Sequence, residues 1–198
     1  FQSECKKFEL VITTSSHSKA ETILSPKLFW RETTRPEVGF SIDFLEIVLD
    51  QISQGKGFEL FKHGYQSWSL SKRMRPSEED RSPRLAFLQY TQENIYSKHK
   101  GKPGEYISEY FTLLCQKEKS TGTLYASLDR GEFGIKFEGH LTIDGEVSSV
   151  SAIYDFYCHP DLRPNSKIAI SKILIKSFTN APEIVLAEYF EQLGEKLN

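Results

Sequence analysis

The chain has 198 residues with a formal net charge of −2, and 38% of its residues are hydrophobic. This length suffices for a core without structural metals or disulfides, and the ordinary apolar fraction excludes a disordered, collagen-like or coiled-coil protein. A near-neutral charge offers no basic surface to a polyanion, so we expect no nucleic-acid partner. The apolar runs are short and interrupted by charge, so we expect no transmembrane helix and no membrane partner.

Most of the chain is predicted to form β-strands, because apolar or alternating runs of strand length are separated by turn signals. In chain order these runs are 8–12, 41–50, 58–61, 106–115, 124–128, 134–138, 147–158 and 167–178. No helical run lies between them, whereas parallel strands would need crossover helices. The pattern therefore predicts an all-β fold, an antiparallel β-sandwich.

The C-terminal segment is predicted to be a helix over residues 182–197. Asn180 is the expected N-cap and Pro182 lies in the first turn, which is a typical helix start. Apolar residues then recur at helical spacing: Val185, Leu186, Tyr189, Phe190, Leu193 and Leu197. We accordingly divide the chain into a β-sandwich domain over 1–180 and a linker helix over 181–198.

A polar stretch over residues 69–83 contains prolines and mixed charge, and it predicts a long loop that is either functional or disordered. The run of Glu78, Glu79 and Asp80 is interpreted as solvated, with Arg75 and Arg81 as charge partners. A glycosidase needs two carboxylates at a set separation, and no spacing in this chain pairs any two. We assign no catalytic residue.

The cysteines and histidines do not form recognisable ligand sets. Cys5, Cys115 and Cys158 are odd in number and widely spaced, which indicates free thiols in a reducing compartment. A cytoplasmic location is expected, but secretion stays open because the sequence does not begin with Met. His140, His159 and Asp161 are scattered, and no zinc or nucleotide motif is present, so neither a metal nor a cofactor is expected.

The segment 63–69 is the most informative in the sequence. Trp68 and Tyr65 offer flat apolar faces that stack on sugar rings, while their polar edges form hydrogen bonds. Gln66 and Ser67 add donors and acceptors suited to sugar hydroxyls. The same composition also fits a buried aromatic corner whose polar groups bond the backbone, and the residues alone do not decide between these interpretations.

At residues 64–69 the sequence GYQSWS resembles the N-terminal domain of glycoside hydrolase family 36, the α-galactosidases and their raffinose-type relatives. Members of that family show a G-[WY]-Q-S-W motif in a β-supersandwich that precedes a catalytic (β/α)₈ barrel. The order of the later strands and the closing helix are also similar. The resemblance implies a supersandwich followed by a linker helix that leads into a barrel.

The resemblance also implies which part of the protein carries the catalytic residues. The family's nucleophile and acid/base are two barrel aspartates without counterparts here, so the parent protein is expected to be an enzyme and this chain alone is not. Trp68 best matches the aromatic that lines the galactose subsite, with Tyr65, Gln66 and Ser67 supporting it. The implied partners are an α-galactoside, the protein's own barrel and a second copy in a homo-oligomer.

Two alternatives stay open at this point. The chain could be a stand-alone, lectin-like carbohydrate-binding sandwich, which requires an exposed aromatic platform. It could also be a structural or oligomerisation domain in which the motif belongs to the core.

Overall fold

The computed structural model describes residues 8–30, 44–50, 56–64, 71–79, 102–116, 119–129, 135–155 and 167–197. Within these ranges twelve strands precede a single C-terminal helix. The strands are β1 (Phe8–Ser18), β2 (Glu21–Trp30), β3 (Phe44–Asp50), β4 (Phe58–Lys62), β5 (Lys72–Met74), β6 (Glu105–Glu109), β7 (Phe111–Gln116), β8 (Gly122–Ser127), β9 (Ile135–Leu141), β10 (Val147–Asp155), β11 (Lys167–Ala169) and β12 (Ile173–Phe178). The helix is α2 (Pro182–Leu197).

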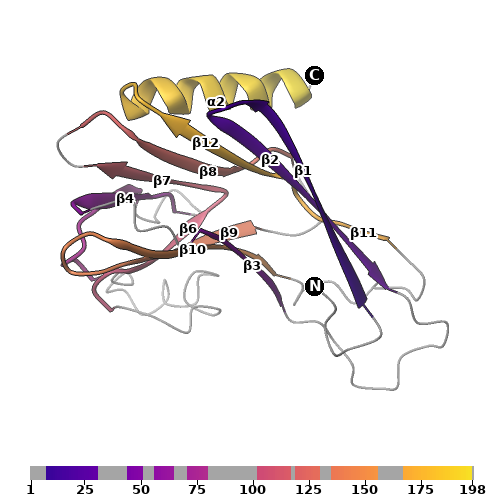
Figure 1. Cartoon of the computed structure of the whole chain (residues 1–198), viewed down its shortest axis with the longest axis horizontal. Helices are drawn as coiled ribbons and strands as arrows, with labels where there is room; N and C mark the ends of the chain where they lie inside the picture. The colour runs from indigo at the N-terminus through magenta and orange to yellow at the C-terminus, as the bar shows by residue number, and fades with distance from the viewer. Residues whose placement is uncertain are drawn as a thin grey trace.

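The strands form two antiparallel sheets. The larger sheet has the order β1-β2-β12-β8-β7-β4-β5, with β11 also pairing with β2, and the smaller sheet has the order β3-β10-β9-β6. Figure 1 shows the smaller sheet on one side of the larger sheet and α2 on the other side. The predicted all-β antiparallel sandwich with a C-terminal helix is therefore confirmed.

A hydrophobic core fills the space between the two sheets. Its largest fully buried members come from both sheets: Leu60, Met74, Tyr106, Tyr125, Ile135, Phe137, Tyr154 and Ile173. Gly139 of β9 lets the side chain of Leu60 from β4 pack against the backbone of the smaller sheet, because a Cβ at residue 139 would lie 2.3 Å from Cδ1 of Leu60. The core thus depends on alternate side chains of each sheet turning inward.

A second hydrophobic cluster lies between the larger sheet and α2. Strands β7, β8 and β12 contribute Phe111, Leu113, Cys115, Leu124, Ala126, Leu174 and Phe178, and α2 contributes Val185 and Tyr189. The hydroxyl of Tyr189 donates a hydrogen bond to the carbonyl of Ser127 at 2.7 Å. These strands are buried on both faces, which explains why their sequences are continuously apolar rather than alternating.

The predicted helix is confirmed over residues 182–197, but its N-cap differs from the prediction. The carbonyl of Ala181 accepts hydrogen bonds from the amides of Ile184 and Val185, so Ala181 takes the N-cap position rather than Asn180. Pro182 then occupies the first helical position, where its missing N–H costs nothing.

Strand β2 was not predicted from the sequence, since Pro26 interrupts it. On one edge β2 pairs with β12 through residues 21–24 and with β11 through residues 27–29. Pro26 lies between these two pairings, where proline is tolerated because no ladder bond is required of it. Pro26 thus lies opposite a break between two partner strands, β12 and β11, rather than at the end of β2.

Candidate functional site

The predicted sugar-lining residues Tyr65, Gln66, Ser67 and Trp68 lie outside the described residues. The two ends of the segment that carries them are described, at Gly64 and Ser71. They continue β4 and β5, which pair antiparallel up to Lys62 and Lys72 at the edge of the larger sheet. The motif therefore connects two adjacent strands at a sheet edge.

Side-chain and backbone hydrogen bonds hold the two ends of the motif together. The amide of Gly64 donates to the hydroxyl of Ser71 at 3.0 Å, and that hydroxyl lies 3.2 Å from Nδ1 of His63. The amide of His63 donates to the hydroxyl of Ser108 at 2.7 Å, and its carbonyl accepts from the amide of Glu109 at 2.9 Å. Both ends are thereby fixed to each other and to β6 of the smaller sheet.

An aromatic cluster connects this region to α2. The rings of His63 and Phe111 are stacked with centroids 4.6 Å apart, and the ring of Phe190 packs edge-on against Phe111 at 5.6 Å. Phe190 is 51% exposed, whereas Phe111 is buried. We call His63, Tyr110, Phe111 and Phe190 the aromatic corner. The corner brings the start of the motif and the C-terminal helix to the same part of the molecule.

Tyr110 is the conformationally unusual member of the aromatic corner. It separates β6 from β7 at the point where the chain passes from the smaller sheet to the larger one. Its φ is 63°, in the left-handed region that non-glycine residues rarely adopt. The sequence predicted one strand over 106–115, so this break is a correction: the apolar run is divided between two sheets.

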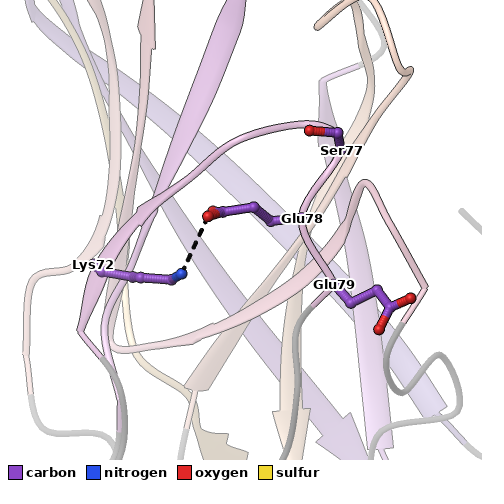
Figure 2. Close-up of a pocket in the computed structure, with 4 residues that line it drawn as sticks. All are labelled: Lys72, Ser77, Glu78 and Glu79. Carbon is purple, nitrogen blue, oxygen red and sulfur yellow. Dashed lines mark hydrogen bonds and ion pairs between the residues drawn. The ribbon is translucent and has the colours of Figure 1, made fainter.

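A shallow pocket of about 340 Å³ lies beside β5 and the turn that follows it. It is lined by Lys72, Ser77, Glu78 and Glu79. Figure 2 shows the side chains of Lys72 and Glu78 pointing toward each other, at 3.4 Å, while that of Glu79 points away from them. This is part of the polar stretch predicted to be a long loop, and the structure instead gives it a short strand and a turn.

The turn at this pocket is built from its own polar groups. The amide of Glu78 donates to the carbonyl of Arg75 at 2.9 Å, and the amide of Arg75 donates to the carboxylate of Glu78 at 3.0 Å. Tyr106, buried below, donates its hydroxyl proton to the carbonyl of Arg75 and accepts from the amide of Gly104 at 3.2 Å. The carbonyl of Glu78 lies 3.1 Å from the same hydroxyl.

The protonation of Glu78 is set by the turn that contains it. The Arg75 amide, helped by nearby Lys72, holds the pKa of the Glu78 carboxyl below its ordinary value of 4.5. A glycosidase acid needs a raised pKa so that it carries a proton near neutral pH. Glu78 is therefore unsuited to that role, and its carboxylate instead caps the turn.

Further carboxylates lie in the smaller sheet, each beside a basic group. Lys136 Nζ lies 3.7 Å from Oε1 of Glu109, its cross-strand neighbour, and both side chains are buried. His140 Nε2 lies 3.6 Å from Oε1 of Glu138. Buried carboxylates that keep a basic neighbour are typical of structural ion pairs. The pairs with Lys136 and His140 therefore explain why Glu109 and Glu138 are present in this sheet.

The remaining sequence candidates contribute little to a site. His159 and Asp161 lie outside the described residues, and the described ranges contain no cluster of three or more His, Cys, Asp or Glu that could hold a metal. Burial raises the pKa of the Cys115 thiol to about 11, which makes it a poor nucleophile. In the part of the chain that the structure describes, no helix has the length and hydropathy needed to cross a bilayer.

Comparison with known proteins leaves the family open. Neither the family models nor the curated proteins gave a match to this chain.

The sequence reasoning missed three members of the aromatic corner as site residues. The sequence predicts Phe111 within a strand and Phe190 on a helix face, and both predictions are confirmed. Tyr110 was missed because nothing in the residue type signals a positive φ. His63 was included in the motif segment, but its stacking on Phe111 depends on a contact between strands far apart in the sequence.

Proposed function

We propose that this chain is the non-catalytic N-terminal domain of an α-galactosidase-like glycoside hydrolase, in which the GYQSWS motif helps to line the galactose subsite. The sugar contacts are Trp68, with Tyr65, Gln66 and Ser67 supporting it. A catalytic barrel of the same protein carries the reaction, and the sandwich packs against it. A second copy of the protein adds oligomer contacts.

One structural observation supports this proposal most directly. The start of the motif at His63 and the C-terminal helix meet through Phe111, although they are more than a hundred residues apart in sequence. A domain that delivers both a binding motif and a connection to a barrel needs these two elements on the same part of its surface. The partly exposed ring of Phe190 gives that surface an apolar contact.

The position of the motif at a sheet edge is a second support. Binding residues are commonly carried on connections held by a rigid scaffold. Here the scaffold is the β4–β5 pair, and the hydrogen bonds of Gly64, His63 and Ser71 define where the connection begins and ends.

The deciding experiment measures hydrolysis of an aryl α-galactoside by the full-length enzyme and by Trp68→Ala. Loss of the indole face removes about 1.5–3 kcal/mol of contact, so kcat/KM is expected to fall by about 10- to 100-fold. Trp30→Phe, a change in the other tryptophan, on β2, is the matched control. Unchanged kcat/KM in Trp68→Ala would remove Trp68 from the subsite.

The isolated chain gives an independent test. It should not hydrolyse the aryl α-galactoside, and measurable turnover by these residues alone would contradict a non-catalytic role. Calorimetric titration of the chain with galactose and raffinose tests the stand-alone lectin alternative. Binding at millimolar affinity or tighter would favour that alternative, whereas the proposed role predicts none without the barrel.

A further inference from the structure

Strand β1 forms an exposed edge of the larger sheet. Within the described residues it pairs with β2 alone, at the end of the sheet away from β4 and β5 (Figure 1). The ladder with β2 keeps one register from Phe8 to Ser16 and becomes irregular only between Ser16 and Ser18. Residues 12–16 are all exposed, so this part of β1 is open to solvent. Its outer side presents a row of backbone N–H and C=O groups that a further strand can bond.

The stretch over residues 10–16 lacks the features that usually protect such an edge. Its sequence is LVITTSS, without a charged residue or a proline. Native edge strands are commonly very short, or carry lysine, proline or a bulge, because an open edge otherwise pairs with another chain. Here the regular and uncharged part of the strand lies before the irregularity at Ser16, and its β-branched residues favour an extended backbone.

The three other terminal strands of the two sheets do carry protective features. At the opposite end of the larger sheet, β5 is three residues long and contains Lys72 and Arg73. In the smaller sheet, β3 contains Glu46, and β6 contains Glu105 and Glu109. Among these four terminal strands, β1 is therefore the one that offers a long uncharged stretch to a further strand.

We propose that β1 pairs antiparallel with β1 of a second copy of this chain, so that the two larger sheets join across a two-fold axis. When a strand pairs with itself, every residue meets a residue of the same stretch, and a charged strand would bring like charges together. The uncharged stretch avoids this cost. Its midpoint is Thr13, so the register that pairs the whole stretch places Thr13 opposite Thr13 and Leu10 opposite Ser16. The pair uses up both edges, and the assembly closes as a dimer.

This interface gives a location to the contact with a second copy, which the proposed function leaves unplaced. It involves no residue of the GYQSWS motif and no sugar. Dimerisation is therefore measured without a carbohydrate, and a failure of the sugar-binding role would leave the interface standing.

The test measures the mass of the full 198-residue chain by sedimentation equilibrium over about 1–100 μM, which covers a micromolar Kd. The wild-type chain should be a dimer at the upper end of this range. Thr13→Lys places two ammonium groups opposite each other at the axis and should raise the dimer Kd by at least about tenfold. Ser148→Lys is the matched control, because it adds the same charge at an exposed position of β10, an inner strand of the smaller sheet, and should leave the Kd unchanged.

Both lysine variants should keep the wild-type Tm within a few degrees, because both positions are exposed. Thr13→Lys also removes a hydrogen bond from the Thr13 hydroxyl to the carbonyl of Ser25, at 3.3 Å, but that bond is exposed and its loss costs little. A monomeric wild-type chain across the whole range overturns the inference, as does a dimer whose Kd is the same in Thr13→Lys. Growth beyond the dimer overturns it too, since the proposed pair is closed.

A crosslink tests the register directly and serves where Thr13→Lys fails to fold. Residues opposite each other in an antiparallel pair have Cα atoms about 4.5–5.5 Å apart, within the range that a disulfide spans. Under mild oxidation, Thr13→Cys should form a disulfide-linked dimer in excess of the wild-type chain, which sets the background from its three native cysteines. Ser148→Cys should show no excess. A Thr13→Cys chain that crosslinks no more than the wild type overturns the proposed pairing.

Discussion

The turn that follows β5 and the aromatic corner differ in how their polar and aromatic groups are used. In the turn, a buried tyrosine and a carboxylate bond the backbone, and the Lys72 and Glu78 side chains that line the pocket pair with each other. The aromatic corner combines a buried ring, Phe111, with two exposed rings, Phe190 and Tyr110, and the backbone of Tyr110 is left-handed. The polar groups of the first region are used within the turn, whereas the second region leaves apolar ring area exposed.

This difference bears on which region is the better candidate for binding. Charged residues line the pocket, yet Glu78 bonds the backbone of its own turn. The aromatic corner has fewer charges, but Tyr110 and Phe190 leave apolar ring area exposed. Exposed aromatic area is therefore the better indicator of a contact surface here.

The largest expected effect is that of Phe111→Ala in the aromatic corner. Phe111 is buried against Phe61, His63, Tyr189 and Phe190, so removal of its ring leaves a cavity between β7 and α2. We expect the free energy of unfolding to fall by about 3–5 kcal/mol, measured by urea denaturation of the isolated chain.

Phe190→Ala is the comparison for this prediction. Its ring touches the same Phe111 ring but is half exposed, so less apolar area returns to water and we expect a loss of about 1 kcal/mol or less. Equal losses in the two variants would show that Phe190 is a core residue. The distinction between the buried and exposed rings of the corner would then be wrong.

A smaller effect is expected from Tyr106→Phe at the turn. The change removes a buried hydroxyl that donates a hydrogen bond to the Arg75 carbonyl and accepts one from the Gly104 amide. Both groups then lose this hydrogen-bond partner. A loss of about 1–3 kcal/mol is expected in the same denaturation assay. Tyr154→Phe, whose hydroxyl donates to the Ser171 carbonyl, is the comparison and should cost less. A neutral Tyr106→Phe would mean that the turn does not depend on this hydroxyl.

The parts of the fold that could be predicted are those with their own local signal. The helix over 182–197 has an apolar stripe and proline in its first turn, β8 follows a recognisable turn, and β9 alternates apolar and polar residues. Strand β5 could not be predicted because its three residues are held by pairing with β4 rather than by their composition. The break at Tyr110 is invisible in sequence, since the apolar run on either side of it is continuous.

The candidate site is likewise only partly predictable from the sequence. The motif is recognisable because its residue types suit a sugar, but the residues that support it come from distant strands and a helix. Phe111 and Phe190 are ordinary core-pattern residues in the sequence. The pairing of β4 with β7 brings Phe111 beside His63, and the packing of α2 on the larger sheet adds Phe190.

The smallest expected effect is the pH dependence contributed by Glu78. Its pKa is lower in the folded chain than its ordinary value of 4.5, so its ionised form stabilises the fold above that value. The contribution is lost as pH falls through the lower, folded pKa. Because the carboxylate is more than a third exposed, we expect about 0.2–1 kcal/mol. Glu78→Gln should make the Tm of the isolated chain less dependent on pH below about 5.

Lys72→Gln distinguishes the two causes of this lowered pKa. The backbone amide of Arg75 is the larger cause and the charge of Lys72 a smaller one, so Lys72→Gln should keep most of the acid dependence that Glu78→Gln removes. If both variants flatten the profile equally, the pocket is held by its exposed ion pair. The turn would then weaken with added salt, and the Lys72–Glu78 ion pair rather than the Arg75 amide would be the main cause of the lowered pKa.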